Sequence, residues 1–203
     1  PVIPAPDLPL RKLAALEALA RYGRAKPAML GGISPAPALW PTSALLDWIG
    51  ILRRTPGIPR GAERLREARV LLRARLVLQG TTLSFTTQES DDLYWLLATP
   101  DTNAARVILE ALDAAAPAQE MARLVRGALG RQVGGAWDST MADAWGVVAL
   151  SRFSKAFEST PVSGAVEATL AGVTRRLAWG GKEAPATRFD WPAAAAELRL
   201  RQD

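Results

Sequence analysis

The 203-residue chain contains no cysteine and no histidine, and each absence removes a class of chemistry. Without cysteine there are no disulfides, no thiolate nucleophiles and no thiolate metal ligands. Without histidine the chain lacks the commonest general base and the commonest transition-metal ligand. Catalysis would have to depend on carboxylates, lysine or serine, and we expect neither a metal nor a cofactor.

The sequence also lacks a long hydrophobic run, because no apolar stretch approaches the roughly 20 residues of a transmembrane helix. Hydrophobic residues make up 49% and charged residues 22%, which is ordinary for a folded globular protein with one full core. There is no initiator methionine, signal peptide or lipobox cysteine. The chain stops within the alternating run 198–201, so we interpret it as a piece of a longer protein. Because it has no long hydrophobic run, we expect that this piece does not itself contact a membrane.

Positive charge is in excess, with a net charge of +5 and eight arginines between positions 53 and 75. On a helix, Arg66, Arg69 and Arg73 share a stripe that is suited to phosphate contacts. However, Glu63 and Glu67 supply local counter-charges, and no aromatic residue interleaves with the arginines to stack on bases. We therefore predict a solvated helix face and no nucleic-acid partner.

Apolar periodicity of the helical kind dominates the first three quarters of the chain, with glycine and proline between the periodic segments. Residues 81–86 are rich in β-branched side chains and fit either an extended segment or a loop. Because the connections are short, we expect neighbouring helices to form antiparallel hairpins. The predicted helices cover residues 10–22, 42–54, 62–78, 90–98, 102–115, 117–129 and 140–157.

The pattern changes after Pro161, where short alternating runs are separated by glycines and prolines. Residues 163–177 also fit a helical period, but the interrupting glycines favour strands. We predict a helical domain over residues 1–160 and a small antiparallel β segment over residues 161–203. Its strands are expected at residues 163–170, 173–179, 186–191 and 195–200.

A glycine turn, two tryptophans and a helix start come together in residues 134–146. Gly134 and Gly135 permit a turn, and Asp138, Ser139 or Thr140 can cap the next helix. The spacing from Thr140 to residue 143 matches a capping box, with aspartate in the acidic place. The apolar face that follows is so wide that we predict a helix buried on most sides. This face contains Met141, Trp145, Val148, Ala149, Phe153, Ala156 and Phe157.

Carboxylates are the only candidate catalytic groups. Asp91 and Asp92 are adjacent, so on a helix they point about 100° apart and cannot face each other across a substrate. Asp138 and Asp143 lie at a helix start, where capping is the favoured role. The alternative is a carbohydrate-active enzyme that uses these aspartates beside a cleft lined by tryptophans. Core packing is instead predicted for Trp48, Trp95 and Trp145, which lie within apolar helical patterns.

The segment around Trp137 resembles the thioester-type domain near the C-terminus of bacterial α2-macroglobulins. Weaker similar pieces lie at residues 11–16, 47–52 and 88–95, and residues 161–164 and 196–200 look like the passage into a neighbouring β-domain. The residues that carry the resemblance, to which we assign a structural role and no catalytic one, are Gly135, Trp137, Asp138, Ser139, Thr140, Trp145 and Gly146.

The resemblance implies a mainly α fold, in which antiparallel helical hairpins form a partial α/α toroid. Family members are large periplasmic protease traps, commonly lipid-anchored, that cage or covalently capture a protease after it cleaves a bait region. Covalent capture needs a Cys-x-Glu-Gln thioester, which this cysteine-free sequence does not supply. Either the thioester lies upstream of Pro1, or the protein belongs to the subtype without one. The implied partners are proteases, neighbouring domains of the same chain and, as a further alternative, cell-wall synthesis proteins.

Overall fold

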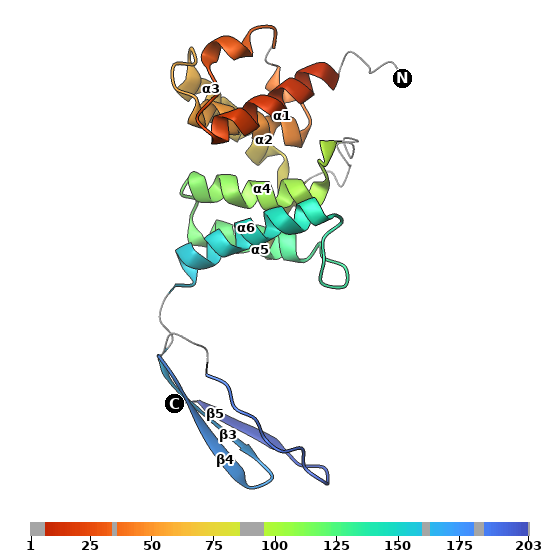
Figure 1. The fold of residues 1–203 in the computed structure, drawn as a ribbon, viewed down its shortest axis with the longest axis vertical. Coiled ribbons are helices and arrows are strands. Elements are labelled where there is room, and N and C mark those ends of the chain that lie inside the picture. The colour runs from red at the N-terminus through yellow and green to blue at the C-terminus, as the bar shows by residue number, and fades with distance from the viewer. Residues whose placement is uncertain (1–6, 34–35, 86–95, 160–162, 181–184, 203) are drawn as a thin grey trace. The chain divides into compact units, whose positions relative to one another are not determined.

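The computed structural model describes residues 7–33, 36–85, 96–159, 163–180 and 185–202. It divides into two compact units, Pro1–Ala156 and Phe157–Asp203. Figure 1 shows that helices dominate the first unit, whereas the second is a small sheet. The mainly α fold with a following antiparallel β segment is therefore confirmed at this level. None of the described helices is long and apolar enough to cross a membrane.

The α-helices among the described residues are α1 (Asp7–Arg21), α2 (Thr42–Arg54), α3 (Gly61–Ala74), α4 (Pro100–Asp113), α5 (Ala118–Leu129) and α6 (Thr140–Phe157). Two short 3-10 helices, Pro27–Leu30 and Pro37–Leu39, lie between α1 and α2. A hairpin of β1 (Leu76–Gln79) and β2 (Thr82–Phe85) follows α3. Successive helices pack on one another in the pairs α1–α2, α2–α3 and α4–α5.

The core of the first unit centres on α2, which is buried from Ser43 to Leu52. Leu45 and Ile49 expose at most 1% of their surface, so α2 is covered on all sides by α1, α3 and α4. Trp48 is 2% exposed, and its ring meets Trp40 edge to face with centroids 5.9 Å apart. The predicted core role of Trp48 is confirmed.

The predicted helix over residues 62–78 is too long, because α3 ends at Ala74. Leu76 and Leu78 instead pair with Phe85 and Leu83 across an antiparallel ladder. Residues 82–85 of the β-branched segment are therefore a strand, paired with residues that the helical periodicity had assigned to a helix. Tertiary contact also favours the hairpin, since Gly127 lets the backbone of Leu83 approach α5 closely.

The expected burial of the helix after Thr140 is wrong. Ala142, Gly146 and Ala149 are its buried residues, whereas Val147 is 66% and Val148 47% exposed. The small residues face the neighbouring elements, and larger apolar side chains on the other side lie in solvent. The wide apolar pattern therefore marks two surfaces of α6, of which only one is covered in this chain.

The second unit is a three-stranded antiparallel sheet in the order β4-β3-β5. Its strands are β3 (Gly164–Leu170), β4 (Val173–Trp179) and β5 (Leu198–Gln202). The strands predicted at 163–170 and 173–179 are confirmed, and the helical alternative is wrong. The strand predicted at 195–200 is observed at 198–202. Residues 186–191, also predicted as a strand, form none. Within that segment, the Phe189 ring packs against the Arg175 guanidinium instead of joining a ladder.

Candidate functional site

The Trp-Asp-Ser-Thr segment, residues 135–146, links the ends of three helices. The Trp137 indole Nε1 donates a hydrogen bond to the Ala128 carbonyl at 2.8 Å, near the end of α5. The Trp137 backbone N–H donates to Asp143 Oδ1 at 2.9 Å, in the first turn of α6. Gly134 and Gly135 have φ of +63° and +87°, which side chains resist, so this turn requires glycine.

Asp138 ties the same segment to the start of α4. Its backbone N–H donates to Asp101 Oδ2 at 3.0 Å, and its own Oδ1 accepts from Thr99 Oγ1 at 2.9 Å. Thr99 is the N-cap of α4, where its oxygen accepts from the Thr102 N–H at 3.1 Å. Asp101 is 5% exposed and also pairs with Arg131. Asp138 is exposed, and its carboxylate is thus engaged in contacts that hold the fold.

Ser139 provides the predicted cap of α6, since its Oγ accepts from the Ala142 N–H at 3.2 Å. The capping box expected from Thr140 is wrong, because Thr140 is already the first helical residue. The acidic member still reaches back, but Asp143 accepts from the amide of Trp137. Capping is therefore displaced by one residue from the sequence pattern.

The close packing of Trp137 explains why residue 146, in the middle of α6, is glycine. A Cβ at this position would lie 2.5 Å from Trp137 Cη2 and 2.8 Å from Cε3, and closer still to Cζ3. The six-membered ring of the indole therefore lies against the α6 backbone at Gly146, where only hydrogen fits. Five of the seven motif residues contribute to this junction, and Thr140 is the first residue of α6. Asp91, Asp92 and Trp95 lie outside the described residues.

Trp145, the seventh motif residue, points away from the junction into a different site. Its ring is half-buried, with the Arg21 guanidinium carbon 4.6 Å and that of Arg106 5.9 Å from the ring centroid. Cation–π contacts of this kind stabilise a guanidinium against an aromatic face. The core role predicted for Trp145 is only partly met, because it also forms a wall of a charged cleft.

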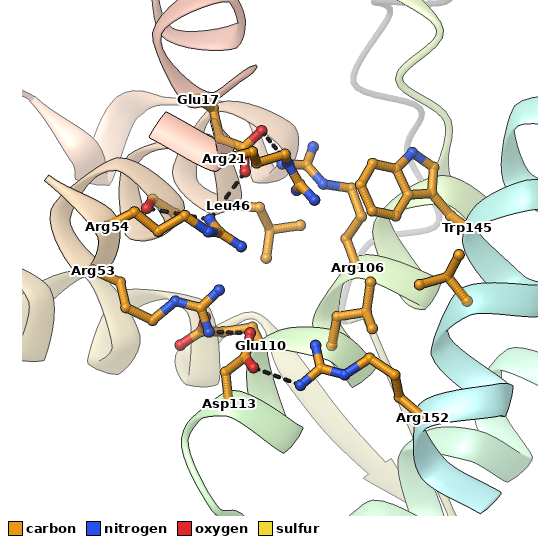
Figure 2. Close-up of a pocket in the computed structure, with 13 residues that line it drawn as sticks. Glu17, Arg21, Leu46, Arg53, Arg54, Arg106, Glu110, Asp113, Trp145 and Arg152 are labelled. Carbon is orange, nitrogen blue, oxygen red and sulfur yellow. Dashed lines mark hydrogen bonds and ion pairs between the residues drawn. The ribbon is translucent and has the colours of Figure 1, made fainter. Parts of the chain in front are cut away.

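This arginine cleft is a cavity of about 90 Å³ between α1, α2, α4 and α6 (Figure 2). Each of the four helices supplies at least one arginine or carboxylate to it. Trp145, Leu46, Leu109 and Val148 form the apolar part of its lining. Its charged lining residues are Glu17, Arg21, Arg53, Arg54, Arg106, Glu110, Asp113 and Arg152.

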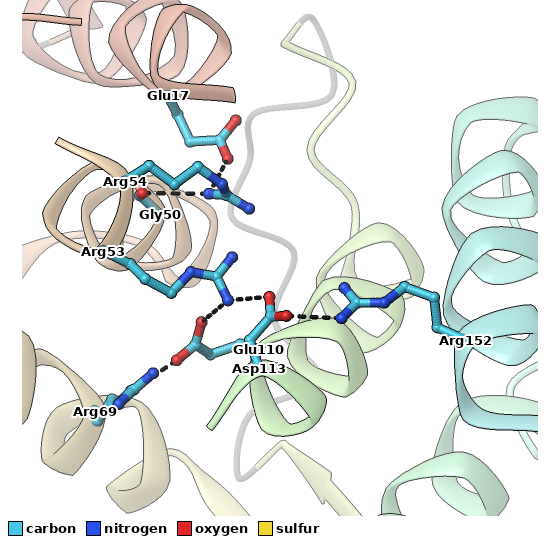
Figure 3. A network of polar contacts seen from close by, with 8 residues as sticks. All are labelled: Glu17, Gly50, Arg53, Arg54, Arg69, Glu110, Asp113 and Arg152. Atoms are coloured by element: carbon cyan, nitrogen blue, oxygen red, sulfur yellow. Dashed lines mark hydrogen bonds and ion pairs between the residues drawn. The ribbon is translucent and has the colours of Figure 1, made fainter. Parts of the chain in front are cut away.

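Shared ion pairs connect the helices around the arginine cleft (Figure 3). Glu17 accepts from Arg21 at 2.7 Å and from Arg54 at 3.2 Å. Asp113 pairs with Arg53 and, at 2.7 Å, with Arg152. These contacts join α1 to α2, and α4 to both α2 and α6.

Two further carboxylates, Glu110 and Asp47, form ion pairs around the cleft. Glu110 pairs with Arg69 of α3 at 2.7 Å and lies 3.8 Å from Arg53. Asp47 is 8% exposed and pairs with Arg106 at 2.5 Å. Each of these carboxylates therefore lies between a helix of the core and an arginine of a neighbouring helix.

The electrostatic environment shifts the pKa values of three of these groups, Asp47, Arg54 and Asp113. Burial raises the pKa of Asp47, and the pairing with Arg106 only partly opposes it. Burial lowers the pKa of Arg54, and the adjacent positive charge of Arg53 lowers it further. Burial alone would raise the pKa of Asp113, but the hydrogen bonds from Arg152 and Arg53 outweigh it and hold this pKa below its ordinary value of 3.8.

The sequence pattern does not indicate this cleft. The arginines cluster in the sequence between residues 53 and 75, whereas the cleft collects arginines from different helices. Glu63 supplies a local counter-charge to Arg60, as predicted, but Arg69 pairs with Glu110 and Arg73 with Glu120, both from other helices. The available signal was a charged residue on the otherwise apolar faces of α2 and α4, as at Asp47 and Glu110.

Comparisons of the chain with protein-family models, with curated proteins and with solved structures find no match.

Proposed function

We propose that this chain is a non-catalytic module of a bacterial protease inhibitor of the α2-macroglobulin type. The observation that supports it most is the role of the Trp-Asp-Ser-Thr segment, on which the resemblance rests. Its indole and its two carboxylates are hydrogen-bonded within the junction of α4, α5 and α6. In this proposal the segment serves to stabilise the fold and not to catalyse a reaction.

The packing of the helices is compatible with an incomplete α/α toroid. Successive helices pack as pairs, and α2 also contacts α4 of the following pair. In a toroid of hairpins, further hairpins would cover the outer surface of the last one. The exposed Val147 and Val148 of α6 provide such a surface. We propose that this face packs against the remainder of the toroid in the full-length inhibitor.

The sheet of the second unit has an apolar face that is only partly covered, since Ala168 on it is buried. The register places Leu170, Val173 and Leu198 side by side on one face, with Leu200 beside Ala168 in the next row. Val173 is 51%, Leu198 53% and Leu200 67% exposed. Because two-residue alternation with one apolar face is typical of a sheet that packs on another sheet, we propose a neighbouring β-domain as its occupant.

In this proposal the full-length protein is periplasmic and lipid-anchored, and it traps a protease after bait cleavage. The present residues include no cysteine, so they provide rigid packing surfaces and not the covalent step. Proteases are then partners of the whole inhibitor, whereas neighbouring domains are the direct partners of this chain. Cell-wall synthesis proteins are a separate set of candidate partners, which pull-down with the intact protein would identify.

The test is titration of the protein that contains this chain against endopeptidases of several classes. We expect digestion of a large protein substrate to fall while cleavage of a small peptide continues, because a caged protease excludes large substrates. A complex should appear by size-exclusion chromatography. An Arg60→Gln variant, which changes only an exposed ion pair, is the matched control. If no endopeptidase forms a complex or is restrained, the proposal is wrong.

A further inference from the structure

We propose that the arginine cleft binds one compact divalent oxyanion of the phosphate or sulfate class. This inference does not depend on the proposed function, since it rests on the charges and the space between α1, α2, α4 and α6.

The charges around the cleft do not balance. Among the described residues, the ion pairs around the cleft involve six arginines but only four carboxylates, which leaves two positive charges in excess. Three of the carboxylates are each shared between two arginines, so no guanidinium of those pairs has a counter-ion to itself. The arginines are Arg21, Arg53, Arg54, Arg69, Arg106 and Arg152, and the carboxylates are Glu17, Asp47, Glu110 and Asp113.

The excess positive charge lies at the cleft itself. Arg53 and Arg54 are consecutive in α2, and both guanidinium groups lie at the cleft (Figure 2). Their repulsion is visible in the lowered pKa of Arg54, to which burial contributes most and the charge of Arg53 next. Arg152 approaches the same region from α6 through its bond to Asp113 (Figure 3). An anion between Arg53, Arg54 and Arg152 would relieve this repulsion.

The volume of the cleft and its access to solvent suit a small ion. A cavity of about 90 Å³ has room for several water molecules or one small ion, but not for a nucleotide or a sugar chain. The side chains of Arg53, Arg54 and Arg152 are 23%, 27% and 48% exposed, so an ion can reach them from solvent. Trp145 and Leu46 close other parts of the wall.

The chemistry of guanidinium favours this ligand class. Its N–H groups form a planar fork that matches the oxygen spacing of phosphate and sulfate and gives paired, charge-assisted hydrogen bonds. A divalent oxyanion also neutralises both excess charges, whereas a single carboxylate neutralises only one. We therefore expect sulfate and phosphate to bind more tightly than acetate or chloride.

The primary experiment is calorimetric titration with sodium sulfate and with sodium phosphate at constant ionic strength, together with NMR of the arginine Nε–H resonances. We expect saturable binding with a Kd of roughly 1 mM or tighter, and shifts confined to cleft arginines. Non-saturable behaviour, or shifts spread over all arginines, would overturn the proposal. Titration with acetate and glycerol phosphate identifies the ligand. Preference for glycerol phosphate indicates a phosphate monoester as the natural source, and preference for acetate overturns the oxyanion assignment.

Two variants change the cleft in opposite directions. Arg152→Gln removes a donor whose side chain is half-exposed, so the fold should survive, and the affinity for sulfate should fall about tenfold or more. Asp113→Asn removes a carboxylate that competes for Arg53 and Arg152, so the affinity should rise several-fold. Circular dichroism verifies folding of both variants, and Arg60→Gln should bind sulfate like the wild type. A loss of affinity in Asp113→Asn, or an equal loss in Arg60→Gln, contradicts a specific site.

Discussion

Replacing Gly146 by alanine tests whether the Trp-Asp-Ser-Thr segment holds the helices together as described. In an uncrowded helix interior, glycine to alanine stabilises a protein by about 0.5–1 kcal/mol, because alanine loses less backbone entropy on folding. At Gly146 the new methyl group would meet the Trp137 ring at 2.5 Å from Cη2. Either the ring or α6 must move, so the sign of the effect should reverse.

The magnitude follows from the displaced contacts. Over-packing of a filled site costs about 1–3 kcal/mol. If the indole shifts, its 2.8 Å bond to the Ala128 carbonyl weakens as well, which adds about 0.5–1.5 kcal/mol. The gain in helix propensity offsets about 1 kcal/mol of this. We therefore expect Gly146→Ala to lower the free energy of unfolding of the helical unit by about 0.5–3.5 kcal/mol.

The assay is urea denaturation followed by circular dichroism at a helical wavelength, which reports on the first unit because the second contains strands. Gly61→Ala is the matched control, since its Cβ would lie 3.6 Å from Ile58 Cβ, an ordinary contact at the first residue of α3. The control should be neutral or stabilising at unchanged slope. A higher midpoint for Gly146→Ala than for the wild type would refute the close approach of Trp137.

Three further changes test other parts of the structure. Gly127→Ala should destabilise the helical unit by about 1–3 kcal/mol, because its Cβ would clash with the Leu83 carbonyl group; an unchanged urea midpoint would mean that the β1–β2 hairpin does not pack there. Trp137→Phe should cost about 1–2 kcal/mol in the same assay by leaving the Ala128 carbonyl without its indole donor, and a neutral result would contradict the bond. Asp113 has a folded-state pKa below its ordinary value of 3.8, so it stabilises the fold above that pH and this contribution is lost as the pH falls through the folded-state pKa. Urea midpoints measured from pH 6 to pH 2.5 should therefore fall more steeply in the wild type than in Asp113→Asn, and parallel profiles would exclude this pairing.

The local elements of this fold were largely predictable because their signals are local. The helix over 42–54 was predicted with its observed bounds, since Pro41 precedes it and a broad apolar face runs through it. The β3–β4 hairpin was predicted as well, because Gly172 with φ of +82° marks its turn. These cases need only periodicity and turn chemistry.

The errors arise where long-range contacts decide the structure. Leu76 and Leu78 fit the helical period of α3, yet their pairing with β2 makes them a strand. Ser139 rather than Thr140 caps α6, while Asp138 accepts from Thr99 Oγ1 and donates its backbone N–H to Asp101, both some forty residues earlier. No local pattern contains that information, since both partners come from the start of another helix.

The Trp-Asp-Ser-Thr segment and the arginine cleft illustrate this difference between local and long-range information. The Trp-Asp-Ser-Thr segment is conspicuous in the sequence because its members are consecutive, and its contacts explain that spacing: a turn, an indole against Gly146 and a cap must follow one another at fixed intervals. The arginine cleft is inconspicuous because each helix contributes only a few of its members. Trp145 belongs to both, since it lies one residue before Gly146 on α6 and therefore points to a different side of the helix. A stable junction at Gly146 thus also fixes the direction in which Trp145 meets Arg21 and Arg106. The conspicuous segment accordingly positions the wall of a site whose charged residues lie far apart in the sequence.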